Sequence, residues 1–207
     1  MKVLMINGSP RNDSNTGAAF KEMCSVFEKE GVEYEIVQIG SADIRGCMAC
    51  RACKKLNRCV IDDLVNETAD KFREADALVI GSPVYYGSAN GTLISFLDRL
   101  FYSTKASVDK RMKVGASVAV ARRAGTTATY DELNKYFTIS GMPVAPSVYW
   151  NLIHGKDVLE ARQDEEGLLT MRVLARNIVF MMRSIELGKE KYGLPEKEEA
   201  VMTNFIR

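Results

Sequence analysis

The chain has 207 residues, of which 46% are hydrophobic and 27% are charged. This length excludes a large multidomain protein, and this composition excludes an intrinsically disordered chain, because enough apolar surface is available to offset the entropy lost on folding. The 28 basic and 27 acidic side chains almost cancel. We therefore expect one domain over residues 1–207, with neither nucleic acid nor an anionic membrane as a partner.

The hydrophobic runs are too short for a membrane protein or a secreted one. A membrane-spanning helix needs about 20 consecutive apolar residues, and a signal peptide has an apolar core of about 7 to 15 residues. The apolar run near the N-terminus covers only residues 3–6. We expect a cytoplasmic protein, in which the five cysteines serve metal or redox chemistry rather than a disulfide framework.

Apolar runs of strand length alternate along the chain with patterns of helical spacing. The predicted strands are residues 3–6, 34–39, 77–80, 114–121 and 144–150. The predicted helices lie around residues 20–27, 64–74, 90–102 and 130–137, and a long closing helix contains residues 174–185. Cys24 falls on the apolar stripe of the first helix, where a cysteine packs as a small core residue.

Alternating strands and amphipathic helices indicate an α/β fold. Because the strands are almost continuously apolar, we expect a doubly wound parallel sheet with helices on both faces and right-handed crossovers. In such sheets ligands bind beyond the carboxyl ends of the strands. The loops that follow the predicted strands are therefore the candidate functional sites.

The loop after the first strand, residues 8–16, places small hydroxyl and amide side chains at the start of a helix. Backbone N–H groups and the helix dipole there favour a phosphate. The candidate phosphate-binding residues are Ser9, Arg11, Ser14, Asn15 and Thr16. The loop has neither the G-x-G-x-x-G pattern nor the lysine of a P-loop, so a mononucleotide phosphate fits it better. Alternatively, Ser14, Asn15 or Thr16 simply caps the helix.

The loops after the third and fourth strands have features of a site for a flat ring. Pro83 restricts the backbone, Gly87 permits close approach, and Tyr85 or Tyr86 can pack against a planar ligand. In the fourth loop, Arg122 or Arg123 can stabilise a reduced flavin by placing positive charge near its pyrimidine end. The alternatives are that the tyrosines are ordinary packing residues and that the arginines only aid solubility.

Four cysteines lie within residues 46–60, at Cys47, Cys50, Cys53 and Cys59. This C-x₂-C-x₂-C-x₅-C spacing lets three thiolates come from one tight loop while the fourth closes the cage of an iron–sulfur cluster. The alternatives are zinc, a redox disulfide and a loop without metal. Structural zinc more often uses two separated C-x₂-C pairs, so among bound metals we favour iron–sulfur.

The segments GSPRNDSNT at residues 8–16 and SPVYYGSANG at residues 82–91 resemble the flavodoxin-like NAD(P)H-dependent FMN reductase family. The cysteine spacing resembles its iron–sulfur flavoprotein branch, in which the motif carries a [4Fe-4S] cluster beside FMN. The resemblance implies a five-stranded sheet of order 2-1-3-4-5. It places the FMN phosphate on the residues of the first loop. The isoalloxazine ring is expected along Pro83, Val84, Tyr85, Tyr86 and Gly87, with the turn from Ala121 through Arg122 to Gly125 completing the pocket.

We therefore expect an FMN-dependent oxidoreductase that takes electrons from NAD(P)H or a reduced carrier such as ferredoxin. The electrons pass to a small acceptor such as a quinone or a flavin. We assign no catalytic side chain, because the flavin carries the redox chemistry and the single histidine, His154, has no triad pattern around it. The alternative function is a non-catalytic flavin- or metal-binding module that senses redox state. The resemblance also implies a homodimer or homotetramer.

Overall fold

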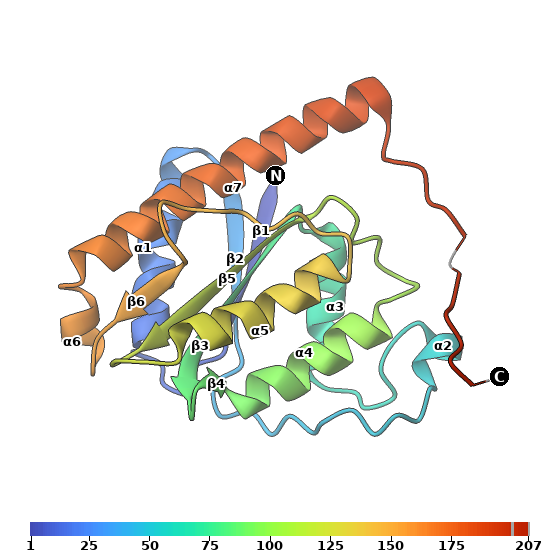
Figure 1. The fold of residues 1–207 in the computed structure, drawn as a ribbon, viewed down its shortest axis with the longest axis horizontal. Helices are drawn as coiled ribbons and strands as arrows, with labels where there is room; N and C mark the ends of the chain where they lie inside the picture. Colours follow the sequence, from blue (N-terminus) through green and yellow to red (C-terminus); the bar gives the residue numbers. More distant parts are fainter. Residues whose placement is uncertain (200, 207) are drawn as a thin grey trace.

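A parallel sheet forms the centre of the protein (Figure 1). The computed structural model describes residues 1–199 and 201–206. The parallel strands are β1 (Lys2–Asn7), β2 (Glu33–Gln38), β3 (Ala77–Tyr85), β5 (Val114–Ala121) and β6 (Leu152–His154). They are ordered β2-β1-β3-β5-β6, and each neighbouring pair is parallel. Counted along the chain, these five strands have the predicted order 2-1-3-4-5. The two-residue strand β4 (Ser88–Ala89), which was not predicted, pairs antiparallel with β3.

The predicted fifth strand at residues 144–150 was wrong in its position. Val144 makes one isolated parallel bridge to Gly115, and the paired strand is Leu152–His154. Prolines at positions 143 and 146 flank that bridge, and a proline has no backbone N–H to donate to a ladder. The apolar side chains at 148–150, which suggested a buried strand, are exposed.

Helices cover both faces of the sheet, as the alternating pattern predicts (Figure 1). One face carries α1 (Asn15–Lys29), α6 (Val158–Ala161) and α7 (Glu165–Tyr192), and the other carries α3 (Leu64–Glu74), α4 (Gly91–Ser103) and α5 (Thr126–Thr138). The short helix α2 (Cys53–Leu56) lies within the cysteine-rich loop. Successive strand residues point to opposite faces, so Val3 and Met5 join one core cluster while Leu4 and Ile6 join the other. Cys24 is buried in the first cluster, as predicted.

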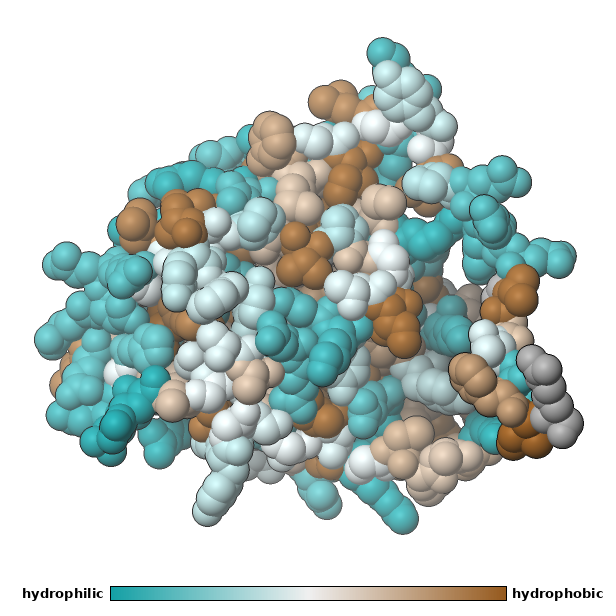
Figure 2. All heavy atoms as spheres, viewed as in Figure 1, coloured by the Kyte–Doolittle hydropathy of each residue, from teal (hydrophilic) through white to brown (hydrophobic). Residues whose placement is uncertain are grey.

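The long helix α7 packs against α1 through one apolar side and exposes the other. Leu174 and Ile178 are completely buried, whereas Phe180 is 71% exposed. On the face of the molecule in Figure 2, hydrophobic residues lie in small groups among hydrophilic ones. Among the described residues, no helix combines the length and the apolar character needed to span a bilayer.

Candidate functional site

The loop after β1, the carboxyl ends of β3 and β5, and the first residues after β5 and β6 converge on one cleft at the carboxyl edge of the sheet. The cleft holds about 560 Å³ of space free of protein atoms, including the part open to solvent. The predicted residues that line it are Ser9, Arg11, Ser14, Asn15, Thr16, Pro83, Val84, Tyr85, Ala121 and Arg122. Three segments far apart in the sequence therefore form one binding surface, because parallel strands end at the same edge.

The first loop is held in shape by its own side chains. Ser14 is the N-cap of α1, and its Oγ accepts a hydrogen bond from the backbone N–H of Gly17 at 3.0 Å. The Oγ of Ser9 accepts from the N–H of Arg11 at 3.2 Å, and the N–H of Ser9 donates to Asn7 Oδ1 at 3.0 Å. The capping interpretation is therefore correct for Ser14. The cap also fixes the start of α1 beside the cleft.

Thr16, in the first turn of α1, has the environment expected of a phosphate-binding residue. The residue is 1% exposed, it lines the cleft, and its hydroxyl has no hydrogen-bond partner among the described residues. A buried hydroxyl without a partner costs about 1–3 kcal/mol. The first N–H groups of a helix also lack intrahelical partners. A phosphate at this point would satisfy both sets of donors, so the loop fits the phosphate of FMN.

The amide of Asn15 has a structural role in addition to lining the cleft. Its Nδ2 donates to the carbonyl oxygen of Gly155 at 2.6 Å. This hydrogen bond joins the loop after β1 to the loop after β6. Gly155 and Lys156 consequently line the cleft as well.

A tight hairpin between β3 and β4 forms the wall that carries Tyr85. Tyr86 and Gly87 have positive φ angles of 52° and 79°, as required at both central positions of a type I′ turn. Glu132 of α5 fixes the hairpin, since its Oε2 accepts from Ser88 Oγ at 2.8 Å and from the N–H of Ala89 at 2.9 Å. The hairpin is therefore anchored at its base.

Three of the predicted flavin-binding residues do not line the cleft. Tyr86 is fully exposed at the hairpin tip. Gly125 packs so closely behind the wall that an added Cβ would lie 2.8 Å from Gly87 Cα and 2.8 Å from Val84 Cγ1. The missing side chain of Gly125 therefore allows two backbone segments to pack together, whereas a Cβ added at Gly87 would meet no atom within 4 Å.

Sequence reasoning missed Val120, Gly155 and Lys156, which also line the cleft. Gly155 and Lys156 follow β6, and the misplaced fifth strand hid the loop to which they belong. Lys156 pairs with Glu160 at 2.6 Å, and hydrogen bonding to this carboxylate raises the pKa of the lysine. With Arg11 and Arg122, Lys156 gives the cleft three cationic side chains, which suits an anionic ligand.

The four predicted metal ligands line a second, smaller hollow, which holds about 370 Å³ of space free of protein atoms, including the part open to solvent. Cys47 and Cys50 are exposed, while Cys53 and Cys59 are partly buried. Burial raises the pKa of the Cys53 thiol, and the neighbouring thiols add smaller effects in the same direction. All four are free thiols, so the structure shows no redox disulfide among them.

The four thiols lie around one cavity, but the described residues show no site for a single metal ion. Within residues 1–199 and 201–206, no group of three or more His, Cys, Asp or Glu side chains is placed to hold one ion. Structural zinc needs four ligands at about 2.0–2.3 Å from a single centre. An iron–sulfur cluster needs a wider set, because each cysteine binds a different iron. Four cysteines around one cavity form a donor set that fits an iron–sulfur cluster.

The backbone of the cysteine loop is turned by residues in an uncommon conformation. Ala49, Arg51 and Asn57 have φ angles of 51°, 60° and 55°. Residues other than glycine seldom adopt this left-handed conformation, and such strain is frequent at functional sites. The sharp turns bring cysteines that are close in sequence to the same cavity.

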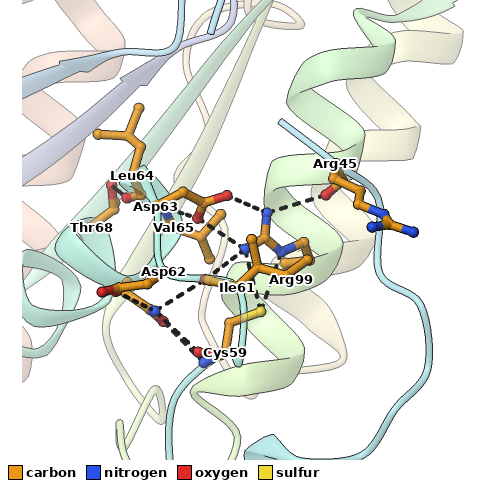
Figure 3. Close-up of polar contacts among 10 residues, drawn as sticks. Arg45, Cys59, Ile61, Asp62, Asp63, Leu64, Val65, Thr68 and Arg99 are labelled. Atoms are coloured by element: carbon orange, nitrogen blue, oxygen red, sulfur yellow. Dashed lines mark hydrogen bonds and ion pairs between the residues drawn. The ribbon is translucent and has the colours of Figure 1, made fainter. Parts of the chain in front are cut away.

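A buried arginine that sequence reasoning missed contacts the fourth cysteine (Figure 3). The Arg99 side chain, from α4, is 1% exposed, and both its Nε and Nη2 donate to Cys59 Sγ at 3.3 Å. Asp63 accepts two hydrogen bonds from it, at 2.6 and 2.9 Å. The sequence did contain a signal for Arg99, because it is a charged residue within the apolar pattern of a predicted helix. A charge at such a position is expected to be buried, and buried charges are almost always paired.

The sheet order and its helices define a flavodoxin-like fold, and comparison with known proteins agrees. Residues 1–157 match the family described as NADPH-dependent FMN reductase. An iron–sulfur flavoprotein of Methanocaldococcus jannaschii is 32% identical over 193 residues, covering 90% of this chain and 100% of that protein. An iron–sulfur flavoprotein of Methanosarcina thermophila is 28% identical over 199 residues, covering 92% and 100%. The chain belongs to the NADPH-dependent FMN reductase family and is an oxidoreductase.

Solved structures show the same fold at low sequence identity. RosB, solved with bound 8-demethyl-8-formylriboflavin-5'-phosphate, has a TM-score of 0.72 at 19% identity, covering 100% of this chain and 92% of that one. An archaeal flavodoxin has a TM-score of 0.59 at 17% identity, covering 88% and 99%. The flavodoxin-like fold predicted from the sequence is confirmed.

Proposed function

We propose that the protein binds FMN in the cleft and transfers electrons from NAD(P)H, or from a reduced carrier such as ferredoxin, to a small acceptor such as a quinone or a flavin. The observation that carries this proposal is the buried hydroxyl of Thr16 at the start of α1, which has no partner among the described residues and lies in the cleft. Bound FMN would supply the redox chemistry itself. The protein side chains bind and orient it and set its electrostatic environment.

Each wall of the cleft has a distinct part in this proposal. Thr16 and the first N–H groups of α1 would donate to the phosphate, and Arg11 would balance its charge. Pro83, Val84 and Tyr85 would lie along the ring system. Arg122 would favour extra negative charge on the pyrimidine end. Thr16 stands at the start of α1, and Pro83, Val84 and Tyr85 stand at the end of β3, which are rigid supports for a site.

We further propose that Cys47, Cys50, Cys53 and Cys59 hold a [4Fe-4S] cluster. The proposal is supported by the shared cavity and by the relatives that are called iron–sulfur flavoproteins. Such a cluster exchanges single electrons, which suits a carrier protein as donor. The thiolates would bind the irons, and the exposed side of the loop would admit the donor.

Anaerobic purification followed by absorption spectroscopy and by iron, acid-labile sulfide and zinc analysis tests the cofactors. We expect flavin bands together with a broad sulfur-to-iron absorption and matching iron and sulfide. Flavin bands without iron or sulfide, even after reconstitution, would overturn the cluster while leaving the FMN proposal intact. Failure to bind supplied FMN would overturn the flavin proposal.

Turnover distinguishes an enzyme from a redox-sensing module. We expect steady-state reduction of a quinone, free flavin or dye by NADPH, NADH or reduced ferredoxin. Both donor classes need to be tried, because the loaded cysteine loop would favour a one-electron donor. Bound FMN that no donor reduces with turnover would instead identify a non-catalytic module.

A further inference from the structure

Arg99 makes an unusual set of contacts for a charged residue on a helix. Its guanidinium donates to five acceptor atoms, which are the sulfur of Cys59, both carboxylate oxygens of Asp63, and the carbonyl oxygens of Arg45 at 3.2 Å and Ile61 at 3.1 Å. The side chain is almost fully buried, and Figure 3 shows its contacts. A buried charge with so many fixed partners holds those partners in one arrangement.

The backbone of Cys59 is fixed from another direction. The N–H of Cys59 donates to Asn66 Oδ1 at 3.0 Å, and Asn66 Nδ2 donates to the carbonyl oxygen of Cys59 at 3.1 Å. Cys47 and Cys50 lie instead on an exposed loop without regular structure. Among the four cysteines, Cys59 is therefore the one whose position is fixed by residues of α3 and α4, which pack in the core.

Hydrogen bonds to a cluster sulfur are one of the factors that set a cluster's reduction potential. A donor to a thiolate stabilises the more negative, reduced state more than the oxidised state, so it raises the potential. Asp63 lowers the reduction potential, because its negative charge offsets part of the positive charge that the Arg99 guanidinium places beside the sulfur. The two residues form a charge-balanced pair, of which only Arg99 contacts the sulfur.

We propose that Arg99 is a positioning residue for the cluster, which holds the Cys59 thiolate in place through its two N–H···S contacts and raises the cluster's reduction potential. This inference depends on the proposed cluster. The inference goes beyond the proposed cluster because it assigns a role to Arg99 of α4, which is not a ligand but sets the position of the ligand Cys59 and the cluster's reduction potential. Asp63 sets how much of the guanidinium charge the cluster experiences.

The test is an EPR-monitored redox titration of the reconstituted full chain at fixed pH. Arg99→Lys keeps the charge but loses the planar fork that reaches Cys59 and Asp63 together. We expect the equilibrium constant for one-electron reduction of the cluster to fall about tenfold, which is about 59 mV in midpoint potential. An unchanged midpoint in a folded, cluster-loaded variant would overturn the inference.

Two further variants separate this role from general electrostatics and from folding. Asp63→Asn keeps the N-cap of α3, because asparagine caps as well as aspartate, and we expect it to raise the midpoint. Arg58→Gln removes an exposed charge beside Cys59 whose side chain pairs with Asp62, and we expect a much smaller shift because solvent screens it. A lower midpoint in Asp63→Asn, or an equal fall in Arg58→Gln, would refute the assignment.

The outcomes also distinguish this inference from the proposal on which it depends. A wild-type chain that takes up no iron and sulfide would overturn the cluster, and the role of Arg99 with it. A loaded wild type with insensitive variants would overturn the role of Arg99 alone. If Arg99→Lys does not fold, the direction of the Asp63→Asn shift decides the question.

Discussion

Thr16 and Thr129 both bury a hydroxyl that has no hydrogen-bond partner among the described residues. Thr16 is 1% exposed and Thr129 is 0% exposed, but only Thr16 lines the cleft. Comparing substitutions at these two threonines therefore separates two effects of a buried hydroxyl. One is the cost to the free protein, and the other is the binding of a ligand that satisfies it.

We predict that Thr16→Val raises the dissociation constant of FMN about tenfold or more, because a hydrogen bond to a charged phosphate is lost. Riboflavin, which has no phosphate, should bind the variant and the wild type equally. Fluorescence titration of the apoprotein with each flavin measures this. Thr129→Val is the control, for which FMN binding should not change. Equal weakening of both flavins by Thr16→Val would show that the residue has a packing role only.

Lys110 is a buried lysine away from the cleft, and it affects the stability of the fold. Its Nζ donates to the carbonyl oxygen of Thr104 at 2.8 Å, and the residue is 7% exposed. Burial lowers the pKa of Lys110 from 10.5 to about 8. Between these two values the unfolded chain binds more protons than the folded one, so stability rises with pH.

We therefore predict that the contribution of Lys110 to the free energy of unfolding rises by up to roughly 3 kcal/mol between about pH 8 and pH 10.5. Lys110→Met should remove this increase, whereas Lys105→Met, at an exposed lysine, should keep it. Urea unfolding of the three proteins across this range gives the difference. A wild-type curve parallel to that of Lys110→Met would contradict the prediction.

The wall of the cleft depends on close packing between the β3–β4 hairpin and the start of α5. At Gly125 the φ angle is 90°, and a Cβ would approach Gly87 Cα and Val84 Cγ1 to 2.8 Å. Neither the conformation nor the space suits a side chain. Gly188, in α7, is a matched control, because a Cβ added there would meet no neighbouring atom within 4 Å.

We predict that Gly125→Ala destabilises the protein by more than about 1 kcal/mol and weakens FMN binding, because the wall must move. Gly188→Ala should stabilise it by about 0.5–1 kcal/mol, since alanine favours a helix interior, and should leave FMN binding unchanged. Thermal unfolding and flavin titration of both variants measure the two effects. Unchanged stability and binding in Gly125→Ala would contradict the proposed packing role.

The elements differ in how well the sequence could predict them. Apolar runs located β1, β3 and β5, and the partly apolar run at residues 34–39 located β2, although β3 continues to Tyr85, beyond its predicted end at Ile80. Proline on both sides of Val144 breaks pairing in a way that an apolar run does not reveal. The type I′ hairpin was missed because its first positive φ falls on Tyr86, and glycine or asparagine is the usual signal at that position.

For the whole molecule, topology explains what the sequence could predict about the cleft. Parallel strands bring their carboxyl ends and the loops after them to one edge, so residues 8–16, 82–85 and 121–122 could be placed at one site from the order of the elements alone. Arg99 could not be placed beside the cysteines, because its contact with Cys59 joins residues 40 positions apart through a loop without regular structure. The homodimer or homotetramer and the cytoplasmic location stay predictions, and light scattering tests the first.

We propose above all that the cleft is the FMN-binding site, with the FMN phosphate at the start of α1. Titration of the wild-type apoprotein with FMN and with riboflavin tests this most directly. We predict saturable binding of one FMN per chain, at least about tenfold tighter than riboflavin, as expected for a bound phosphate. No binding of FMN, or equal affinity for the two flavins, would contradict the account.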